Sequence, residues 1–168
     1  MNRLLVAGVV GMLTIAVSTA AAAQGGSGEG AAALARVTGA YELASVNGKT
    51  VPAPAWKRAS ADTTCTTVAN AGSFLFDSYG RWAAMTTERD RCFTQAGARD
   101  IRPDVATLAA GRYTMRGDTL ELIDEWHPGA TITGTVTGKT MTLDFPGMAE
   151  SSGQKVKYTL RQVRMLRQ

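Results

Sequence analysis

The residues best suited to acid–base or metal chemistry lie in the stretch DEWHPG, which holds the single histidine of the chain, His127. Asp124 and Glu125 come just before it, so a histidine–carboxylate pair or a metal site is conceivable. Both kinds of chemistry need several groups that converge in space. Here the neighbours fall in an expected loop before Pro128, and no triad or metal-ligand spacing completes the set. A solvated turn is therefore the favoured interpretation of His127, and no metal site is predicted.

Other signatures of catalysis do not occur in the sequence. No serine lies in a G-x-S-x-G elbow, and there is no dinucleotide-binding glycine pattern or P-loop. The adjacent carboxylates of Asp124 and Glu125 would point to opposite faces of an extended strand. We therefore predict no catalytic residue and no cofactor, and an enzyme ranks last among the function classes.

The two cysteines, Cys65 and Cys92, are candidates for a disulfide, a metal pair or a reactive thiol. A metal pair would need more ligands than a chain with one histidine offers. An even cysteine count in an exported protein favours a disulfide. We expect Cys65 and Cys92 to be bonded in the mature protein.

A group of large side chains could line a cavity for a small hydrophobic molecule. They are Phe76, Trp82, Met85, Tyr113 and Met115. Aromatic rings together with methionine suit an adaptable apolar pocket. The favoured alternative is a packed core, because side chains of this size can fill a small barrel.

Hairpins are expected to position these residues. The segment GRYTMRGDTLEL alternates apolar and polar residues on both sides of Gly117-Asp118, and GTVTGKTMTL repeats the pattern around Gly138-Lys139. Period-two alternation gives each strand one dry face and one wet face. Asn47-Gly48 favours a tight type I′ turn. The polar segment from Glu88 to Asp104 is predicted to be the longest loop, attached through Cys92.

The fold class follows from the repetition of such hairpins. About eight short strands joined by short connections pair with their neighbours in sequence. An amphipathic sheet of this kind hides its edges by closing on itself. The sequence therefore predicts an all-β protein, an antiparallel up-and-down β-barrel of about eight strands.

Several motifs resemble those of a known group of proteins. They are GAYELASVNGKTVPA, the FDSYGRW hairpin, GRYTMRGDTLEL, GTVTGKTMTL and the closing YTLRQ. These segments are similar to the small secreted bacterial lipocalin-like proteins, over roughly residues 38–162. The resemblance implies a lipocalin-like barrel and carries over no catalytic residue. Tyr41 stands where true lipocalins have the tryptophan of their G-x-W motif.

The first 23 residues have the three parts of a secretory signal peptide. Arg3 precedes an apolar run from Leu4 to Val17, and STAAAAQ follows with small residues in A-x-A spacing. The apolar run is shorter than the roughly 20 residues that span a bilayer. We expect cleavage, a secreted or periplasmic location, and no transmembrane segment afterwards.

The rest of the chain is predicted to form one domain with two short appendages. Residues 24–37 are expected to be a flexible tether with at most one helical turn, in AAALAR. Residues 38–163 form the barrel, and residues 164–168 form a basic tail that is most simply solvated. The net charge of +4 at pH 7 falls short of a nucleic-acid-binding composition, and a monomer is expected.

These observations favour a non-enzymatic, exported lipocalin-like barrel that binds a small apolar molecule. The alternative is a protein–protein interaction module, such as an inhibitor of a secreted hydrolase. An open apolar interior would favour ligand binding, and a filled interior would favour the module.

Overall fold

The computed structural model describes residues 28–94, 97, 99–101, 103–126, 129, 131–146 and 155–163. The predicted signal peptide, the first residues of the tether, His127 and the basic tail lie outside the described residues. The described elements are α1 (Gly28–Val37) and the strands β1 (Gly39–Val46), β2 (Lys49–Thr50), β3 (Ala53–Ala59), β4 (Thr63–Phe76), β5 (Arg81–Thr94), β6 (Arg99–Ile101), β7 (Val105–Arg116), β8 (Thr119–Asp124), β9 (Thr131–Thr137), β10 (Thr140–Phe145) and β11 (Val156–Val163).

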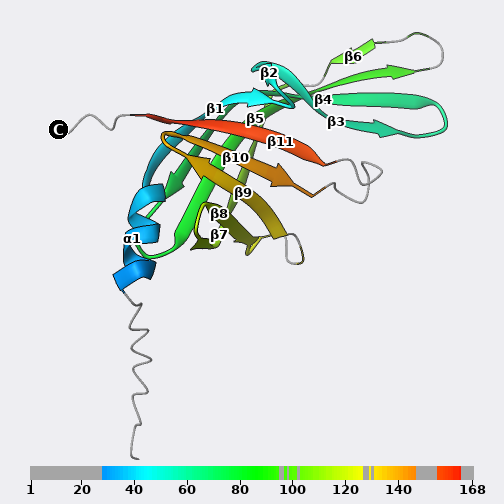
Figure 1. The fold of residues 1–168 in the computed structure, drawn as a ribbon. Helices are drawn as coiled ribbons and strands as arrows, with labels where there is room; N and C mark the ends of the chain where they lie inside the picture. The colour runs from blue at the N-terminus through cyan, green and yellow to red at the C-terminus, as the bar shows by residue number, and fades with distance from the viewer. Residues whose placement is uncertain are drawn as a thin grey trace, which may run out of the picture.

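Eight strands close into an antiparallel up-and-down barrel (Figure 1). Their order is β1-β11-β10-β9-β8-β7-β5-β4, and β4 pairs back onto β1. In this closing pair Tyr41 lies opposite Phe74, and Gly39 lies opposite Phe76. Closure gives the backbone groups of both edge strands partners. The all-β barrel predicted from the sequence is confirmed.

The alternation of side chains along the strands is also confirmed. Leu120, Leu122 and Leu143 are completely buried, whereas Thr133 is exposed. The turn after β1 has positive φ at both Asn47 (51°) and Gly48 (77°), as a type I′ turn requires. Local sequence therefore determines both the dry face and the turns of these hairpins.

Helix α1 replaces much of the expected flexible tether. Val37 is fully buried, and Leu34 packs against the core. The hydroxyl of Tyr41 donates a hydrogen bond to the carbonyl of Val37 at 2.9 Å, and Arg36 pairs with Asp118 in the β7–β8 turn at 2.7 Å. Alanine-rich sequence favours a helix, and burial of its apolar residues stabilises it. Within the described residues, no helix is long and apolar enough to cross a bilayer.

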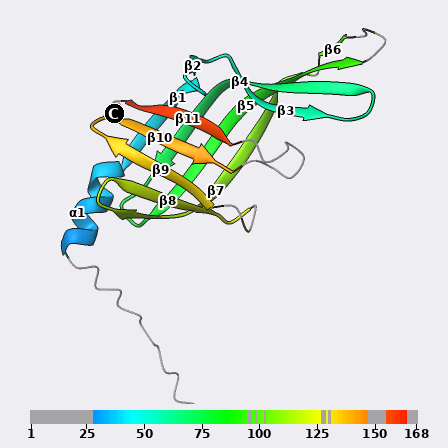
Figure 2. The ribbon, with the colours of Figure 1, turned by 45° about the vertical axis from the view of Figure 1, so that its right-hand side comes forward.

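The helix marks one end of the barrel, which we call the helix end. The tight turns after β4, β7 and β9 lie at this end (Figures 1 and 2). The opposite end extends into a protruding sheet, which we call the arm. It consists of β3, β6, residues 63–68 of β4 and residues 89–94 of β5. We call this opposite end the arm end.

The arm corrects one prediction and confirms another. Residues Glu88 to Thr94 continue β5 instead of forming a loop, and two of their charged side chains have ion-pair partners on neighbouring segments, in the Arg89–Asp104 pair at 2.6 Å and the Arg58–Asp90 pair. Cys65 and Cys92 lie directly opposite each other in β4 and β5 and form the expected disulfide, with Cα atoms 4.0 Å apart.

Candidate ligand-binding site

Three of the five predicted lining residues pack together in the core. Phe76, Trp82 and Tyr113 are at most 3% exposed. The rings of Phe76 and Tyr113 meet edge to face with centroids 5.3 Å apart, and Phe76 meets Tyr41 in the same way at 5.6 Å. Edge-to-face contacts between buried rings are typical of a packed core.

The polar atoms of these rings also have partners in the protein. The indole nitrogen of Trp82 donates to the carbonyl of Ile123 at 3.2 Å, and the hydroxyl of Tyr113 donates to the carbonyl of Asp77 at 2.6 Å. Such bonds attach the rings to the backbone at the end of β8 and in the β4–β5 turn. They therefore contribute to barrel structure.

The two methionines of the predicted set lie on opposite faces of the sheet. Met115 is partly buried and packs against the core. Met85 is 49% exposed, and its neighbours across the sheet are Ser73 and Leu108. Trp82 and Thr86 on the same strand point inward, so strand alternation turns Met85 outward. The prediction that Met85 lines the interior is wrong.

Toward the arm end, a second group of aromatic side chains surrounds Tyr158 of β11. The rings of Tyr158 and Phe145 are 4.7 Å apart between centroids, and Phe74 meets Tyr158 edge to face at 6.5 Å. Trp56 of β3 is 7% exposed, and its side chain acts to lower the pKa of the Tyr158 hydroxyl. Aromatic side chains from β3, β4, β10 and β11 therefore converge at this end.

Glu88 of β5 reaches into this aromatic group. Its Oε1 atom accepts hydrogen bonds from the hydroxyls of Tyr158 and Thr86, each at 3.4 Å. Since β4 and β1 separate β5 from β11 in the sheet, the bond to Tyr158 crosses the barrel interior. Among the described residues, no ion pair involves Glu88 and no hydrogen-bond donor reaches its Oε2 atom.

Burial raises the pKa of the Glu88 carboxyl, and the negative charge of Asp90 acts in the same direction. The hydrogen bonds from Thr86 and Tyr158 and the charge of Arg58 oppose this rise only in part. Burial likewise raises the pKa of the Tyr158 hydroxyl, with a further contribution from Glu88. The site thus holds an acid whose ionised form is poorly compensated.

The interior wall beside Glu88 is accessible to solvent. Val105 of β7 is the direct strand partner of Glu88 and is 59% exposed. Thr107 is exposed as well, although it pairs with the buried Thr86. Directly paired residues of antiparallel strands point to the same side of a sheet. The β7 residues that pair with Thr86 and Glu88 are therefore exposed on the interior side of the sheet.

Sequence reasoning missed Glu88 because it begins a charged run that resembles a loop. A signal was nevertheless present, because Trp82, Thr86 and Glu88 are even numbers of positions apart and therefore share one face of a strand. Extending the alternation of this strand by one more step would have placed Glu88 inside the barrel.

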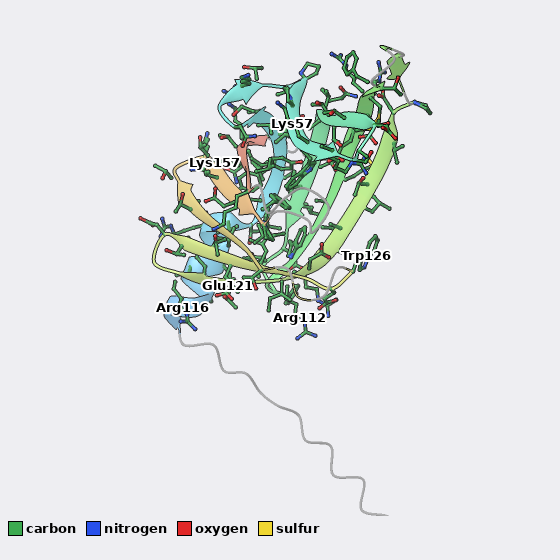
Figure 3. All side chains as sticks on the ribbon, turned by 90° about the vertical axis from the view of Figure 1, so that its right-hand side faces the viewer. Lys57, Arg112, Arg116, Glu121, Trp126 and Lys157 are labelled. Carbon is green, nitrogen blue, oxygen red and sulfur yellow. A yellow bond between two sulfur atoms is a disulfide. The ribbon has the colours of Figure 1, made fainter. Side chains whose placement is uncertain are left out.

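A different hollow lies on the outer face near the β4–β5 turn. It has a volume of about 430 Å³, and its lining includes Leu75, Arg81, Ala83 and Arg112. Arg112 points away from the barrel (Figure 3) and pairs with Glu125 at 3.2 Å, although both side chains are more than half exposed. An exposed pair of this kind contributes little binding energy, so this hollow is the weaker candidate.

The predicted acid–base neighbourhood of His127 is described only in part. Asp124 is buried, and its carboxylate accepts a hydrogen bond from the backbone nitrogen of Trp126 at 2.9 Å. His127 itself lies outside the described residues. Within the described part of the chain, no group of three potential metal-ligating side chains comes together.

Comparison of the chain with protein-family models, with curated proteins and with solved structures finds no match. The closed antiparallel barrel of eight strands agrees with the fold that the lipocalin-like motifs imply.

Proposed function

We propose that this protein is a non-enzymatic, exported, lipocalin-like barrel of the small secreted bacterial type, and that it binds a small, largely apolar molecule at the arm end. The observation that carries the proposal is the asymmetry of the interior. Packed rings occupy one part of it, whereas in the other part the exposed Val105 pairs with Glu88, whose carboxylate accepts a hydrogen bond from Tyr158. Apolar walls with a few convergent polar groups are typical of ligand sites.

Export is supported by two independent features. The Cys65–Cys92 disulfide fits an oxidising compartment, where such bonds persist. The N-terminal pattern of Arg3, an apolar run and small residues is typical of a signal peptide.

The test is a thermal-shift titration of the oxidised protein with a neutral apolar probe, 4-phenylbutanol. A ligand that binds only the folded state stabilises it by about 2.7 kcal/mol at 100 times its Kd. The melting temperature should then rise by several degrees, with a parallel change in tryptophan fluorescence.

A matched pair of variants locates the site. Val105→Trp places an indole beside Glu88 and should abolish the shift. Leu108→Trp, on the opposite face of the same strand and 49% exposed, should leave the shift intact. The absence of a shift in the wild type, or an equal shift in both variants, contradicts binding at the arm end.

The outer face favours a second candidate, the protein–protein interaction module. Leu75, Met85 and Leu108 are each 49% exposed and lie on β4, β5 and β7, which are neighbours in the sheet. Exposed apolar patches often mark protein interfaces. If the protein inhibits a secreted hydrolase through this face, Met85→Lys should abolish inhibition while Glu121→Lys, on the outer face of β8, preserves it.

A further inference from the structure

We propose that the ligand carries a positive charge: it is a small organic amine with an apolar body, whose ammonium group binds between the Glu88 carboxylate and the rings of Tyr158 and Phe145. This inference rests on the proposed function and names the class of ligand for the same site.

The first argument is the state of the Glu88 carboxylate. It is partly buried, and no cation forms an ion pair with it within the described part of the chain. Arg58, whose charge acts on Glu88, is bound to Asp90. A partly buried carboxylate without an ion-paired partner is costly, and such groups concentrate at functional sites. A ligand ammonium would provide the missing charge and a donor for Oε2.

The second argument is the length of the two hydrogen bonds that Glu88 accepts. Both are 3.4 Å, longer than the roughly 2.5–3.0 Å of an ordinary O–H···O hydrogen bond. Asp90, two residues further along on the same side of β5, accepts a bond from Thr67 at 2.6 Å and also binds Arg58. Asp90 therefore has the contacts of a structural acid, and Glu88 has unused capacity to accept stronger bonds.

The third argument is the aromatic surrounding. The faces of aromatic rings attract cations within about 6 Å of the ring centroid. The rings of Tyr158 and Phe145 pack against each other with centroids 4.7 Å apart, and the Tyr158 hydroxyl reaches Glu88, so an ammonium group bound to Glu88 would lie beside this pair of rings. A ligand carboxylate would instead meet both the negative faces of the rings and the charge of Glu88. The exposed Val105 offers a contact for the apolar body of the ligand. The site therefore selects a cation over an anion.

The experiment compares three probes with one shared body: 4-phenylbutylamine, 4-phenylbutanol and 4-phenylbutyrate. Their affinities for the oxidised wild-type protein are measured by isothermal titration calorimetry at pH 7. We expect the amine to bind at least tenfold more tightly than the alcohol, and the carboxylate to bind most weakly.

Two glutamate variants identify the group responsible. Glu88→Gln keeps the shape of the side chain and removes its charge, so the amine should lose its advantage while the alcohol binds as before. Glu121→Gln removes a carboxylate from the exposed outer face of β8 (Figure 3) and should keep the wild-type ranking. Circular dichroism verifies that both variants are folded.

Each outcome decides between the two proposals. If the alcohol or the carboxylate binds wild type as tightly as the amine, the inference of a cationic ligand is wrong, and ligand binding itself stands. If no probe binds, both proposals are wrong. If folded Glu88→Gln retains the preference for the amine, Glu88 does not recognise the charge. The wild-type ranking alone decides the inference if Glu88→Gln does not fold.

Discussion

Two acids on one strand show how much the partners of a residue determine its role. Glu88 and Asp90 point to the same side of β5 and are two positions apart. Asp90 is bound by Arg58 and Thr67, whereas Glu88 has only long hydrogen bonds from two hydroxyls. The charge of Asp90 is therefore compensated, and that of Glu88 costs free energy of folding. Proteins commonly sacrifice stability in this way at functional sites.

This difference predicts how stability depends on pH. Burial raises the folded-state pKa of the Glu88 carboxyl above its ordinary value of 4.5. The folded protein thus holds this proton more tightly than the unfolded chain. The resulting stabilisation is complete below the unfolded pKa and is lost as the pH rises through the folded pKa. Glu88→Gln, which has no charge to bury, should unfold at higher urea concentration than wild type at pH 8.

The difference in urea denaturation midpoint between Glu88→Gln and wild type should shrink as the pH falls toward 4. Urea denaturation midpoints at a series of pH values measure it, with Glu121→Gln as the exposed control. Asp90, Arg58, Thr86 and Tyr158 are present in both proteins, so their contributions largely cancel. A Glu88→Gln protein that is less stable than wild type at pH 8 would show that the charged carboxylate stabilises the fold.

At the scale of the element, strand alternation determines which substitutions the barrel tolerates. Leu122 of β8 and Leu143 of β10 are fully buried, and Thr133 of the intervening β9 is exposed. An unpaired buried carboxylate costs several kcal/mol, against a total domain stability of about 5–15 kcal/mol. We therefore expect Leu122→Asp and Leu143→Asp to be severely destabilised and Thr133→Asp to change stability by less than about 1 kcal/mol.

Thermal and urea unfolding of the three variants measure these effects. All three introduce the same carboxylate, so charge alone would affect them equally, and only burial separates them. Similar midpoints for the two leucine variants and Thr133→Asp would be incompatible with the observed register.

The hairpins were predictable from the sequence because their information is local. Alternation and turn residues such as Asn47-Gly48 and Gly117-Asp118 determine strand faces and connections over a few residues. The arm was not predictable in this way, since its charged strands depend on partners distant in sequence, such as Asp104 for Arg89. Helix α1 was underestimated for a similar reason, because burial of Val37 against the barrel supplements the weak helical pattern of its sequence.

The candidate site was less predictable than the fold. The sequence indicated which side chains are large and apolar, and three of them, Phe76, Trp82 and Tyr113, do lie inside the barrel. Whether rings pack against one another or border an opening depends on the closure of the sheet. That closure also brings Glu88 and Tyr158, 70 positions apart, into contact.

For the whole molecule, the important division is between the closed barrel and the arm. Every strand of the barrel has a partner on both sides, whereas the arm ends in β3 and β6, each paired through one side only among the described strands. The Cys65–Cys92 disulfide lies within the arm and joins its two central strands. The disulfide thus lies in the part of the sheet whose outermost strands have a partner on one side only.

This arrangement predicts a local effect of removing the disulfide. In the chain-entropy model, a link between residues 27 positions apart contributes about 3.5 kcal/mol to global stability as an upper value. The Cys65→Ala/Cys92→Ala variant should therefore melt at a lower temperature while keeping its far-UV spectrum.

Native-state hydrogen exchange should become faster in residues 63–68 and 89–94, because the arm can open without opening the barrel. Exchange in β8 and β10 should stay slow under conditions where the barrel remains folded, because strands there have partners on both sides. A uniform acceleration across all strands would instead show that arm and barrel open as one cooperative unit.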